Sequence, residues 1–415
     1  MTMTKTVTIK PKRILALGYS VRHIVCSGSR AGYEMYAADA FGDIDTRRFV
    51  KRYFPLDLEL PPLQRLSELR NLKDEISKVD GLIIGSGFEH VDFRFLGDSN
   101  MRKILGNAPE KMKEISNKAW FASRLDDLNI PHPRTYTGSE LAEQIEEVGA
   151  EDLQINYPVV AKPACGGGGA ANFFCYNEKE LIRSVTQLPD FLYQEYIKGI
   201  HASVSTISTR RAAVAVSVNE QLLGLEALSA PAPFVYCGNI TPFVTKFSDV
   251  LCSIAEYLTG ELGLIGSNGV DFVITDDGPC VIEVNPRLQG SLDTVERSTG
   301  LNVVDAHVKA VVMGELPDKE EVAAERYAVK AIVFSKQEAI VTGNLYLDGR
   351  ECGSAIADIP ARGRIVKAGE PIATGIGIGD SKERACTDAM KNITRIKACV
   401  DSGSQVQSSG FTVQG

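Results

Sequence analysis

The chain has 415 residues, of which 44% are hydrophobic, so it can bury the cores of two or three domains. Its 45 Lys and Arg against 53 Asp and Glu give a net charge of -8. The acidic balance argues against a broad nucleic-acid-binding surface, and no apolar run approaches the roughly 18 residues of a membrane-spanning helix. Nine cysteines without a CxxC pair, and a polar first segment without a hydrophobic block, predict a cytoplasmic protein with neither a disulfide framework nor a secretory signal.

The first segment of the chain predicts a parallel α/β sheet. Short apolar runs at 14–17, 35–38 and 81–84 each end at Gly or Asp, and helical stretches separate them. Ligands gather at the carboxyl ends of parallel strands, so the loop from Gly85 to Glu89 is a candidate substrate loop. A plain strand-to-helix turn explains this loop equally well.

The middle of the chain predicts helices mixed with antiparallel strands. One helix is expected over 116–138, ending in a proline-marked stop. Short strand pieces over 202–227, with a turn near Asn219, predict an antiparallel meander. Two later helices are expected to end at Gly300 and Gly314, because glycine is the residue type that closes helices in a left-handed conformation.

The last part of the chain shows no residue pattern with a chemistry of its own. Strands rich in Gly and Pro, followed by a helix from about Ser381 to Cys399, are expected over 327–399. The tail after Asp401 is rich in Ser, Gly and Gln without charge, which predicts disorder.

A lysine followed by a glycine run is the strongest chemical signal. The segment from Val159 to Ala170 reads VVAKPACGGGGA, in which an apolar strand leads to Lys162 and the glycines 166–169 follow. Glycines let successive backbone N–H groups approach an anion, and a lysine adds a compact positive charge. This combination suits a polyphosphate, although its order differs from the Walker pattern. A bare flexible loop is the alternative.

A pair of apolar strands over 268–291 predicts a hairpin that carries carboxylates. A tight turn between the strands would place Asp271 opposite Glu283, and Asn285 would share their face. Two carboxylates held across a ladder repel each other unless a cation lies between them, and such oxygen ligands suit Mg²⁺. A solvated polar face of an ordinary hairpin is the alternative. Arg287 follows at once, and an arginine beside a metal can neutralise a phosphoryl group during transfer.

The segment between these two signals offers contacts for a nucleotide base. Gln194 and Glu195 lie on an expected strand over 191–197, and His201 follows shortly after it. A lone histidine is more often structural than functional, so His201 by itself predicts no role.

Together these motifs resemble the ATP-grasp superfamily, in the branch that contains biotin carboxylase and the formate-dependent purine-synthesis ligases. The resemblance runs from about Asn117 to Gly314. The fold class that it implies is α/β, with α+β character in the ATP-grasp part. The implied units are a Rossmann-like substrate domain over 1–115, an ATP-grasp domain over 116–325 with lobes over 116–195 and 196–325, a closing domain over 326–400, and a disordered tail over 401–415.

The resemblance also assigns roles to residues, and it implies ATP with Mg²⁺ or Mn²⁺ as cofactors. The phosphate contacts would be Lys118, Lys162, Gly166, Gly167, Gly168 and Gly169. The base and ribose contacts would be Gln194, Glu195, Tyr196, Ile197 and His201. The metal ligands would be Asp271, Glu283 and Asn285, and the catalytic residues Arg287 and Lys162. The substrate candidates are Gly87, Glu89, Arg287 and Gln289, with Ser20, Arg22 and Asp39 added by position alone.

The activity that the resemblance implies is an ATP-dependent carboxylate-amine ligase. A carboxylate would attack the γ-phosphate to give an acyl phosphate and ADP, and an amine would then displace phosphate. A carboxylase-like reaction on bicarbonate is the first alternative, since NPRLQGS at 285–291 is close to the biotin carboxylase pattern. Ser291 stands where those enzymes carry a glutamate, which favours the ligase. A non-catalytic ATP-binding sensor is the alternative of another class.

The partners implied are small-molecule acid and amine substrates. A second copy of the chain in a homodimer is also expected from the resemblance. Neither nucleic acid nor a membrane is expected as a partner.

Overall fold

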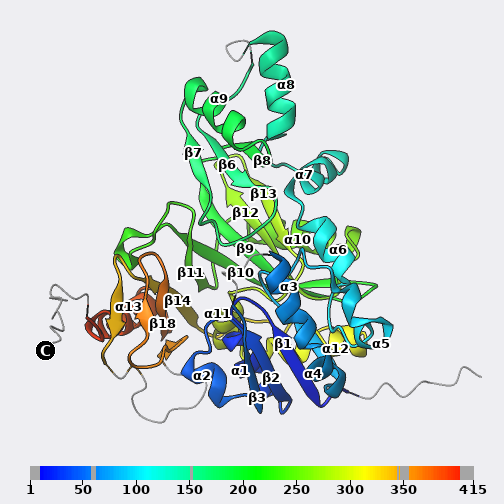
Figure 1. The fold of residues 1–415 in the computed structure, drawn as a ribbon, viewed down its shortest axis with the longest axis vertical. Helices are drawn as coiled ribbons and strands as arrows, with labels where there is room; N and C mark the ends of the chain where they lie inside the picture. Colours follow the sequence, from blue (N-terminus) through cyan, green and yellow to red (C-terminus); the bar gives the residue numbers. More distant parts are fainter. Residues whose placement is uncertain (1–9, 58–61, 150–152, 344, 346–354, 402–415) are drawn as a thin grey trace, which may run out of the picture.

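The fold is built around one large sheet that connects two smaller sheets (Figure 1). A four-stranded parallel sheet lies at the amino-terminal end, a small antiparallel sheet lies at the opposite end, and an eight-stranded antiparallel sheet connects them. This arrangement confirms the predicted α/β class, with α+β character in the middle of the chain. The computed structural model describes residues 10–57, 62–149, 153–343, 345 and 355–401.

The amino-terminal sheet consists of four parallel strands in the order β3-β2-β1-β4. Its strands are β1 (Arg13–Leu17), β2 (Glu34–Asp39), β3 (Arg52–Pro55) and β4 (Gly81–Ile84). The three apolar runs of the sequence are β1, β2 and β4, whereas β3 buries none of its residues and therefore has no apolar run to predict it. The helices of this part are α1 (Arg22–Arg30), α2 (Ile44–Arg48), α3 (Pro62–Asn71), α4 (Lys73–Lys78), the 3-10 helix η1 (Phe93–Leu96), α5 (Asp98–Met101) and α6 (Pro109–Ile115).

The small antiparallel sheet carries the lysine of the glycine motif near the end of a strand. Its strands, in the order β5-β8-β6-β7, are β5 (Thr135–Thr137), β6 (Val159–Pro163), β7 (Phe173–Cys175) and β8 (Phe191–Glu195). Two helices pack on it, α8 (Gly138–Val148) and α9 (Glu178–Gln187). Leu141 and Leu181 of these helices share a buried core with Val159 and Tyr193 of the strands, which fixes the sheet that presents Lys162.

Helix α7 (Lys118–Asp127) leads into the small sheet and is shorter than predicted. Asn117 caps it, since the Asn117 side chain accepts hydrogen bonds from the backbone N–H groups of Ala119 and Trp120 at 3.1 and 3.3 Å. The prediction of one helix over 116–138 is wrong beyond Asp127, because Asn129 turns into the left-handed region with φ 53° and β5 pairs with β8.

The central sheet runs without interruption through eight strands. In spatial order they are β13 (Pro279–Asn285), β12 (Gly266–Ile274), β9 (Ile200–Ser208), β10 (Ala213–Leu223), β11 (Tyr236–Thr241), β14 (Tyr327–Phe334), β18 (Pro371–Gly379) and β16 (Ile356–Ala357). Helix α10 (Ser248–Glu261) covers part of one face, where Leu251 and Leu258 share a core with Val204 and Phe272. A short 3-10 helix, η3 (Glu226–Leu228), precedes β11.

The meander in this sheet differs from the prediction at Asn219. This residue lies inside β10, fully buried, and not in a turn. Its Nδ2 donates to Ser205 Oγ at 3.2 Å, and its Oδ1 accepts from Thr241 Oγ1 at 2.6 Å. A buried network of hydroxyls and amides thus supplies the partners that the asparagine would otherwise find in a turn, and single-sequence patterning cannot foresee it.

The carboxyl-terminal segment continues the central sheet. Strand β14 pairs with both β11 and β18, and α13 (Lys382–Ala398), the predicted final helix, packs against them. A further sheet contains β17 (Ile365–Val366), β15 (Ala339–Val341) and β19 (Val400–Asp401) in that order. The predicted closing domain and the other domain boundaries therefore remain predictions, and the predicted tail after Asp401 lies outside the described residues.

A shared apolar core joins the amino-terminal sheet to the central part of the molecule. Ile14 and Ile83 of the sheet are buried with Leu292 and Val304, which belong to α11 (Leu292–Thr299) and α12 (Val303–Val312). These two helices are followed by glycines with φ of 78° at 300 and 71° at 314, as predicted. Within the described ranges, no helix has the length and apolar character needed to cross a membrane.

Candidate active site

Two carboxylates face each other across the β12–β13 hairpin, as the sequence predicts. Asp271 is paired with Glu283 in the ladder, and Asn285 Nδ2 donates to Asp271 Oδ2 at 3.0 Å. From β10, Gln221 Nε2 donates to Asp271 Oδ1, also at 3.0 Å. Sequence reasoning missed Gln221, because no motif surrounds it and only the strand pairing brings it to the hairpin. The two amides hold Asp271 in place beside Glu283.

The electrostatics of the hairpin fit a divalent cation. Burial raises the pKa of Asp271 well above its usual range, and the Glu283 carboxylate raises that pKa further. Two carboxylates and an amide oxygen are a ligand set that Mg²⁺ accepts, with water and phosphate oxygens completing its shell. Among the described residues, no three His, Cys, Asp or Glu side chains form a metal-binding group. A metal here would therefore depend on Asp271, Glu283, Asn285 and oxygens of a ligand.

Two lysines approach this hairpin from the side of the small sheet. Lys162 is 4% exposed, and its Nζ donates to Gln194 Oε1 at 2.7 Å. Burial lowers the pKa of Lys162 to about 8, with attraction to Glu283 acting in the opposite direction. Lys118, the first residue of α7, donates from Nζ to Gly166 O at 2.7 Å and lies 3.7 Å from Glu283 Oε2. Ammonium groups and carboxylates thus converge on one place.

The glycine run forms a loop between the small sheet and the central sheet. Gly168 O accepts a hydrogen bond from Tyr236 N at 3.3 Å. Gly169 has φ 73°, and a Cβ atom there would lie 1.9 Å from Phe234 O, so no larger residue fits. A Cβ atom on Gly167 would lie 4.0 Å from Arg287 Nη2. The loop therefore extends from Lys118 to Arg287.

Arg287 connects the hairpin to the amino-terminal sheet. Its Nε donates to Glu89 Oε1 at 2.5 Å, its Nη2 to Asn285 Oδ1 at 3.0 Å, and its Nη1 to Leu288 O at 3.2 Å. Glu89 Oε2 accepts from Gly87 N at 2.7 Å. Burial by itself would raise the pKa of Glu89, but Arg287 and backbone hydrogen bonds together outweigh burial and the pKa is lowered. The loop after β4 thus reaches the site, and Glu89 is an ion-pair partner of Arg287.

These side chains form one group that is called the Asp271 cluster below. Its members are Glu89, Lys118, Lys162, Asp271, Glu283, Asn285 and Arg287.

The residues predicted to contact a base begin at the end of β8. Gln194 uses both ends of its amide, because Nε2 donates to Thr135 Oγ1 at 2.8 Å while Oε1 accepts from Lys162. The carboxylate of Glu195 accepts from Asn156 N at 3.2 Å and from Asn156 Nδ2 at 3.1 Å. These contacts place Gln194 and Glu195 next to Lys162 in the small sheet.

The remaining base and ribose candidates follow in the connection from β8 to β9. The ring of Tyr196 lies 5.2 Å from the ring of Phe174, and Ile197 follows it in the chain. His201 lies on β9 opposite Val273, and burial lowers its pKa, so this imidazole is neutral at pH 7. The structure thus places the predicted base contacts at the end of β8, in the connection to β9 and at the start of β9, and their roles remain predictions.

Gln289 and Ser291 lie in the interior. Gln289 is 8% exposed, and its Oε1 accepts from Ser205 Oγ at 3.0 Å. The same Ser205 hydroxyl lies 3.1 Å from Ser291 Oγ. The Gln289 side chain also covers Gly269, where a Cβ atom would lie 1.7 Å from it. Both residues therefore belong to the buried polar network that includes Asn219.

Two of the candidates chosen by position alone have structural contacts. Arg22 is 2% exposed and binds Asp293 with two hydrogen bonds of 2.6 and 2.5 Å. Its Nε also donates to Asp358 Oδ1 at 2.9 Å, and Lys330 Nζ lies 3.2 Å from Asp293 Oδ2. We call Arg22, Asp293, Lys330 and Asp358 the Asp293 cluster. It ties α1 to α11 and to the carboxyl-terminal segment.

Asp39, the second of these two candidates, is fully buried at the end of β2. Its carboxylate accepts from Val21 N at 3.1 Å and from Gly42 N at 3.0 Å, which fixes the entry into α1 and the following turn. Ser20 lies beside it and is half-buried. These contacts explain Asp39 without a ligand.

Tyr236 is a site residue that sequence reasoning missed. Its hydroxyl donates to Asn239 Oδ1 at 2.8 Å, and a Cβ atom on Gly290 would lie 3.3 Å from its ring. Burial raises the pKa of Tyr236, and the charge of Asp271 raises it further, which keeps the phenol neutral. The YCGNIT strand that carries it has no motif, so no sequence signal could have revealed this residue.

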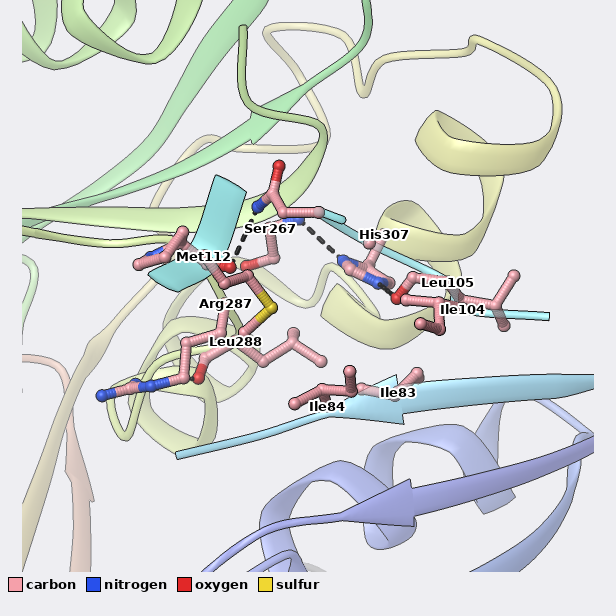
Figure 2. A pocket seen from close by; sticks show the side chains of 12 residues that line it. Ile83, Ile84, Ile104, Leu105, Met112, Ser267, Arg287, Leu288 and His307 are labelled. Atoms are coloured by element: carbon pink, nitrogen blue, oxygen red, sulfur yellow. Dashed lines mark hydrogen bonds between the residues drawn. The ribbon is translucent and has the colours of Figure 1, made fainter. Parts of the chain in front are cut away.

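A small cavity lies behind Arg287, at the junction of β4, β12 and α12. Figure 2 shows that Arg287 directs its guanidinium away from the apolar lining of Ile83 and Ile84. His307 accepts from Ser267 N at 2.7 Å and lies 3.0 Å from Leu105 O, which fixes its ring (Figure 2). The cavity of about 10 Å³ holds one water at most. It is therefore too small for a substrate.

The small antiparallel sheet and the larger one bring two lysines and a glycine loop to a carboxylate hairpin. This arrangement defines the class of two-lobed ATP-grasp folds. The chain carries an ATP-grasp domain, because the sequence pattern of that domain family matches residues 115–291. The match begins next to the predicted start at Asn117 and ends before the predicted end at Gly314.

One sequence relative and two solved structures are similar to this chain. An uncharacterized protein from Methanocaldococcus jannaschii is 28% identical over 380 residues, which cover 88% of each chain. The biotin carboxylase domain of the Hydrogenobacter thermophilus 2-oxoglutarate carboxylase, solved as a dimer with magnesium ADP and bicarbonate, has a TM-score of 0.71 at 17% identity and covers 94% of this chain and 90% of that one. The L-amino acid ligase from Bacillus licheniformis has a TM-score of 0.66 at 18% identity, with 94% and 98% covered. At these identities the two solved structures establish the fold alone.

Proposed function

We propose that this protein is an ATP- and magnesium-dependent ligase that activates a carboxylate as an acyl phosphate and transfers the acyl group to an amine. The observation that carries the proposal is the position of Lys118, which lies 3.7 Å from Glu283 and donates to Gly166 O at 2.7 Å. One ammonium group thus links the glycine loop to the carboxylate hairpin. A triphosphate with a divalent cation is a ligand that complements all three.

The donor set fits magnesium ATP. Lys118, Lys162 and the backbone of the glycine loop would hold the phosphates, while Asp271 and Glu283 would hold the metal with Asn285. Bound Mg²⁺ would draw negative charge away from the transferring phosphoryl group. Gln194 to Ile197 and His201 would line the base and ribose. The solved carboxylase domain with magnesium ADP supports this assignment by its similar fold.

The chain's own contribution to the reaction would be positioning and neutralisation of charge. Arg287 would hold the substrate carboxylate beside the γ-phosphate. A carboxylate oxygen then forms a bond to the γ-phosphorus while the bond to ADP breaks. The amine nitrogen attacks the acyl carbon, phosphate leaves, and the amine proton passes to water. The glycine loop, which extends from Lys118 to Arg287, would shield the acyl phosphate from hydrolysis.

A carboxylase reaction on bicarbonate is the competing function, and Ser291 argues against it. Ser291 is 4% exposed, contacts Ser205, and carries no carboxylate that could activate bicarbonate. A nucleotide-binding sensor would bind ATP without consuming it. We also propose small-molecule substrates and a homodimer, as in the carboxylase domain that was solved as a dimer, and light scattering of the purified protein tests the dimer.

The experiment is an ADP-release screen with purified protein, ATP and Mg²⁺ over amino acids, short peptides, bicarbonate and pterin-type carboxylates. We expect ADP release that requires both an acid and an amine. With the active acid labelled by ¹⁸O in its carboxylate, one label should appear in phosphate. Label transfer from bicarbonate would replace the proposal by the carboxylase, and ATP binding without ADP release would replace it by the sensor.

A further inference from the structure

The ion pair between Arg287 and Glu89 lies beside the glycine loop, on the side of the amino-terminal sheet. Arg287 has the Gly167 loop on one side and Glu89 on the other, with Nε and Oε1 2.5 Å apart. The two side chains are 13% and 14% exposed, so the pair is largely desolvated but can still be reached. Any carboxylate that binds the Nε side of Arg287 has to displace Glu89.

Each member of this pair is anchored independently of the other. Arg287 is held by Asn285 Oδ1 at 3.0 Å and by Leu288 O at 3.2 Å. Glu89 is held through Oε2 by Gly87 N at 2.7 Å. If a ligand separated the pair, these contacts would keep both charged groups facing each other. Arg287 belongs to the hairpin and Glu89 to the loop after β4, so the pair lies between the ATP-grasp domain and the amino-terminal sheet.

The charge balance decides which ligand can open the pair. A simple carboxylate would satisfy Arg287 and leave the Glu89 carboxylate without its partner in a desolvated position, which is strongly unfavourable. A molecule that brings an ammonium group as well as a carboxylate replaces both partners at once. An α-amino acid carries an ammonium group and a carboxylate on one carbon.

We infer that the acid substrate is a zwitterionic amino acid whose carboxylate binds Arg287 and whose ammonium binds Glu89. The inference rests on the proposed function. The carboxylate then faces the glycine loop and the lysines, where the phosphoryl group would be transferred. The ammonium keeps its proton because Glu89 pairs with it, so the attacking amine must come from the second substrate. Glu89 would thereby prevent the amino group of the acid substrate from acting as the attacking amine.

The test compares each amino acid with the acid that lacks only its amino group. The panel contains the proteinogenic amino acids and their deamino counterparts, such as propionate for alanine and 3-phenylpropionate for phenylalanine, each with ATP, Mg²⁺ and methylamine, an amine that carries no carboxylate. We expect the best amino acid to exceed its counterpart by roughly 100-fold in kcat/KM for ADP release, the size typical of an unpaired buried charge. The same pair is titrated calorimetrically into protein loaded with magnesium ADP, which measures binding without turnover.

Glu89→Gln is the decisive variant. It should raise KM for the amino acid, improve binding of the deamino acid, and reduce the ratio at least tenfold. Asp92→Asn is the matched control, because Asp92 lies on the same segment and pairs with the exposed Arg94 at a distance of 2.5 Å. Melting curves confirm that both variants fold. A deamino acid as the preferred substrate, or an unchanged ratio in Glu89→Gln, would overturn the inference alone. No ADP release with any acid would overturn the proposed function and the inference with it.

Discussion

The Asp293 cluster and the Asp271 cluster are both groups of buried charges at the border between the amino-terminal sheet and the rest of the molecule, but their charges are balanced differently. In the Asp293 cluster, burial alone would raise the pKa of Asp293, yet Arg22 and Lys330 outweigh burial and the pKa lies well below its usual range. In the Asp271 cluster, burial and Glu283 act in the same direction and raise the pKa of Asp271.

The difference separates a structural charge cluster from one that is suited to a ligand. The Asp293 cluster supplies enough cations for its own carboxylates, and Asp358 likewise has a pKa lowered to about 2, because Arg22 and Lys330 outweigh burial. The Asp271 hairpin holds two carboxylates that still repel each other. Buried charge alone therefore does not indicate function, whereas two like charges held side by side, each raising the other's cost of ionisation, mark a candidate site.

The largest expected effect comes from removing one carboxylate of the hairpin. Glu283→Gln should lower ADP release about 1,000-fold or more, because it removes one of the proposed metal ligands. The folded state should not suffer, since the substitution also relieves repulsion with Asp271. Steady-state kinetics and a melting curve measure both effects.

The control for this variant is Asp277→Asn, which removes a charge from the exposed turn of the same hairpin. It should keep wild-type activity. Near-normal activity of Glu283→Gln would show that the hairpin does not serve the reaction, and the contrast between the two clusters would then lose its meaning.

The opposite result is expected in the Asp293 cluster. Arg22→Met should destabilise the protein by about 3–5 kcal/mol, because Asp293 and Asp358 lose a buried partner. Magnesium ADP affinity of the folded fraction should be unchanged. Urea denaturation measures the first effect and calorimetry the second.

Arg52→Met is the matched control, since Arg52 forms an exposed ion pair with Glu75 and its side chain is 54% exposed. Loss of such a surface pair should change stability by less than about 1 kcal/mol. If Arg22→Met reduced the free energy of magnesium ADP binding by as much as the free energy of unfolding, the Asp293 cluster would be part of the nucleotide site.

The smallest effect is a pH dependence that sharpens the contrast. Lys162 has a pKa of about 8, lowered by burial and by Lys118 and opposed by Glu283. The charged form, which attracts phosphate, is present below pH 8 and lost above it. Affinity for magnesium ADP should therefore fall about tenfold from pH 7 to pH 9. Lys162→Ala should bind more weakly at pH 7 and lose this slope, and an equal slope in the variant would assign the titration to another group.

The sequence predicts those parts of the site that depend on local spacing. An apolar run placed Lys162 on a strand before the four glycines, and alternation along a hairpin paired Asp271 with Glu283. The structure has Lys162 on β6 and Asp271 paired with Glu283, as expected. The pair of Arg287 with Glu89 spans 198 residues and depends on how two sheets pack. Single-residue patterns contain no information on that packing.

The same limit applies to the fold. Apolar runs predicted three strands of the parallel sheet, but β3 was missed because none of its residues is buried. Strand β11 of the central sheet was missed because its buried residues, in YCGNIT, include polar ones. Asn219 was assigned to a turn because asparagine is typical of turns. Its hydrogen-bond partners Ser205 and Thr241 come from neighbouring strands, which the sequence does not reveal.

The continuity of the central sheet has a practical consequence for dissecting this enzyme. Strand β14 protects the outer edge of β11, and the start of β11 holds the glycine loop through Tyr236. A fragment that stops at the end of the matched segment, or anywhere before β14, would leave an unpaired strand edge open to self-association. Expression trials should therefore retain the segment through α13, even where only nucleotide binding is of interest.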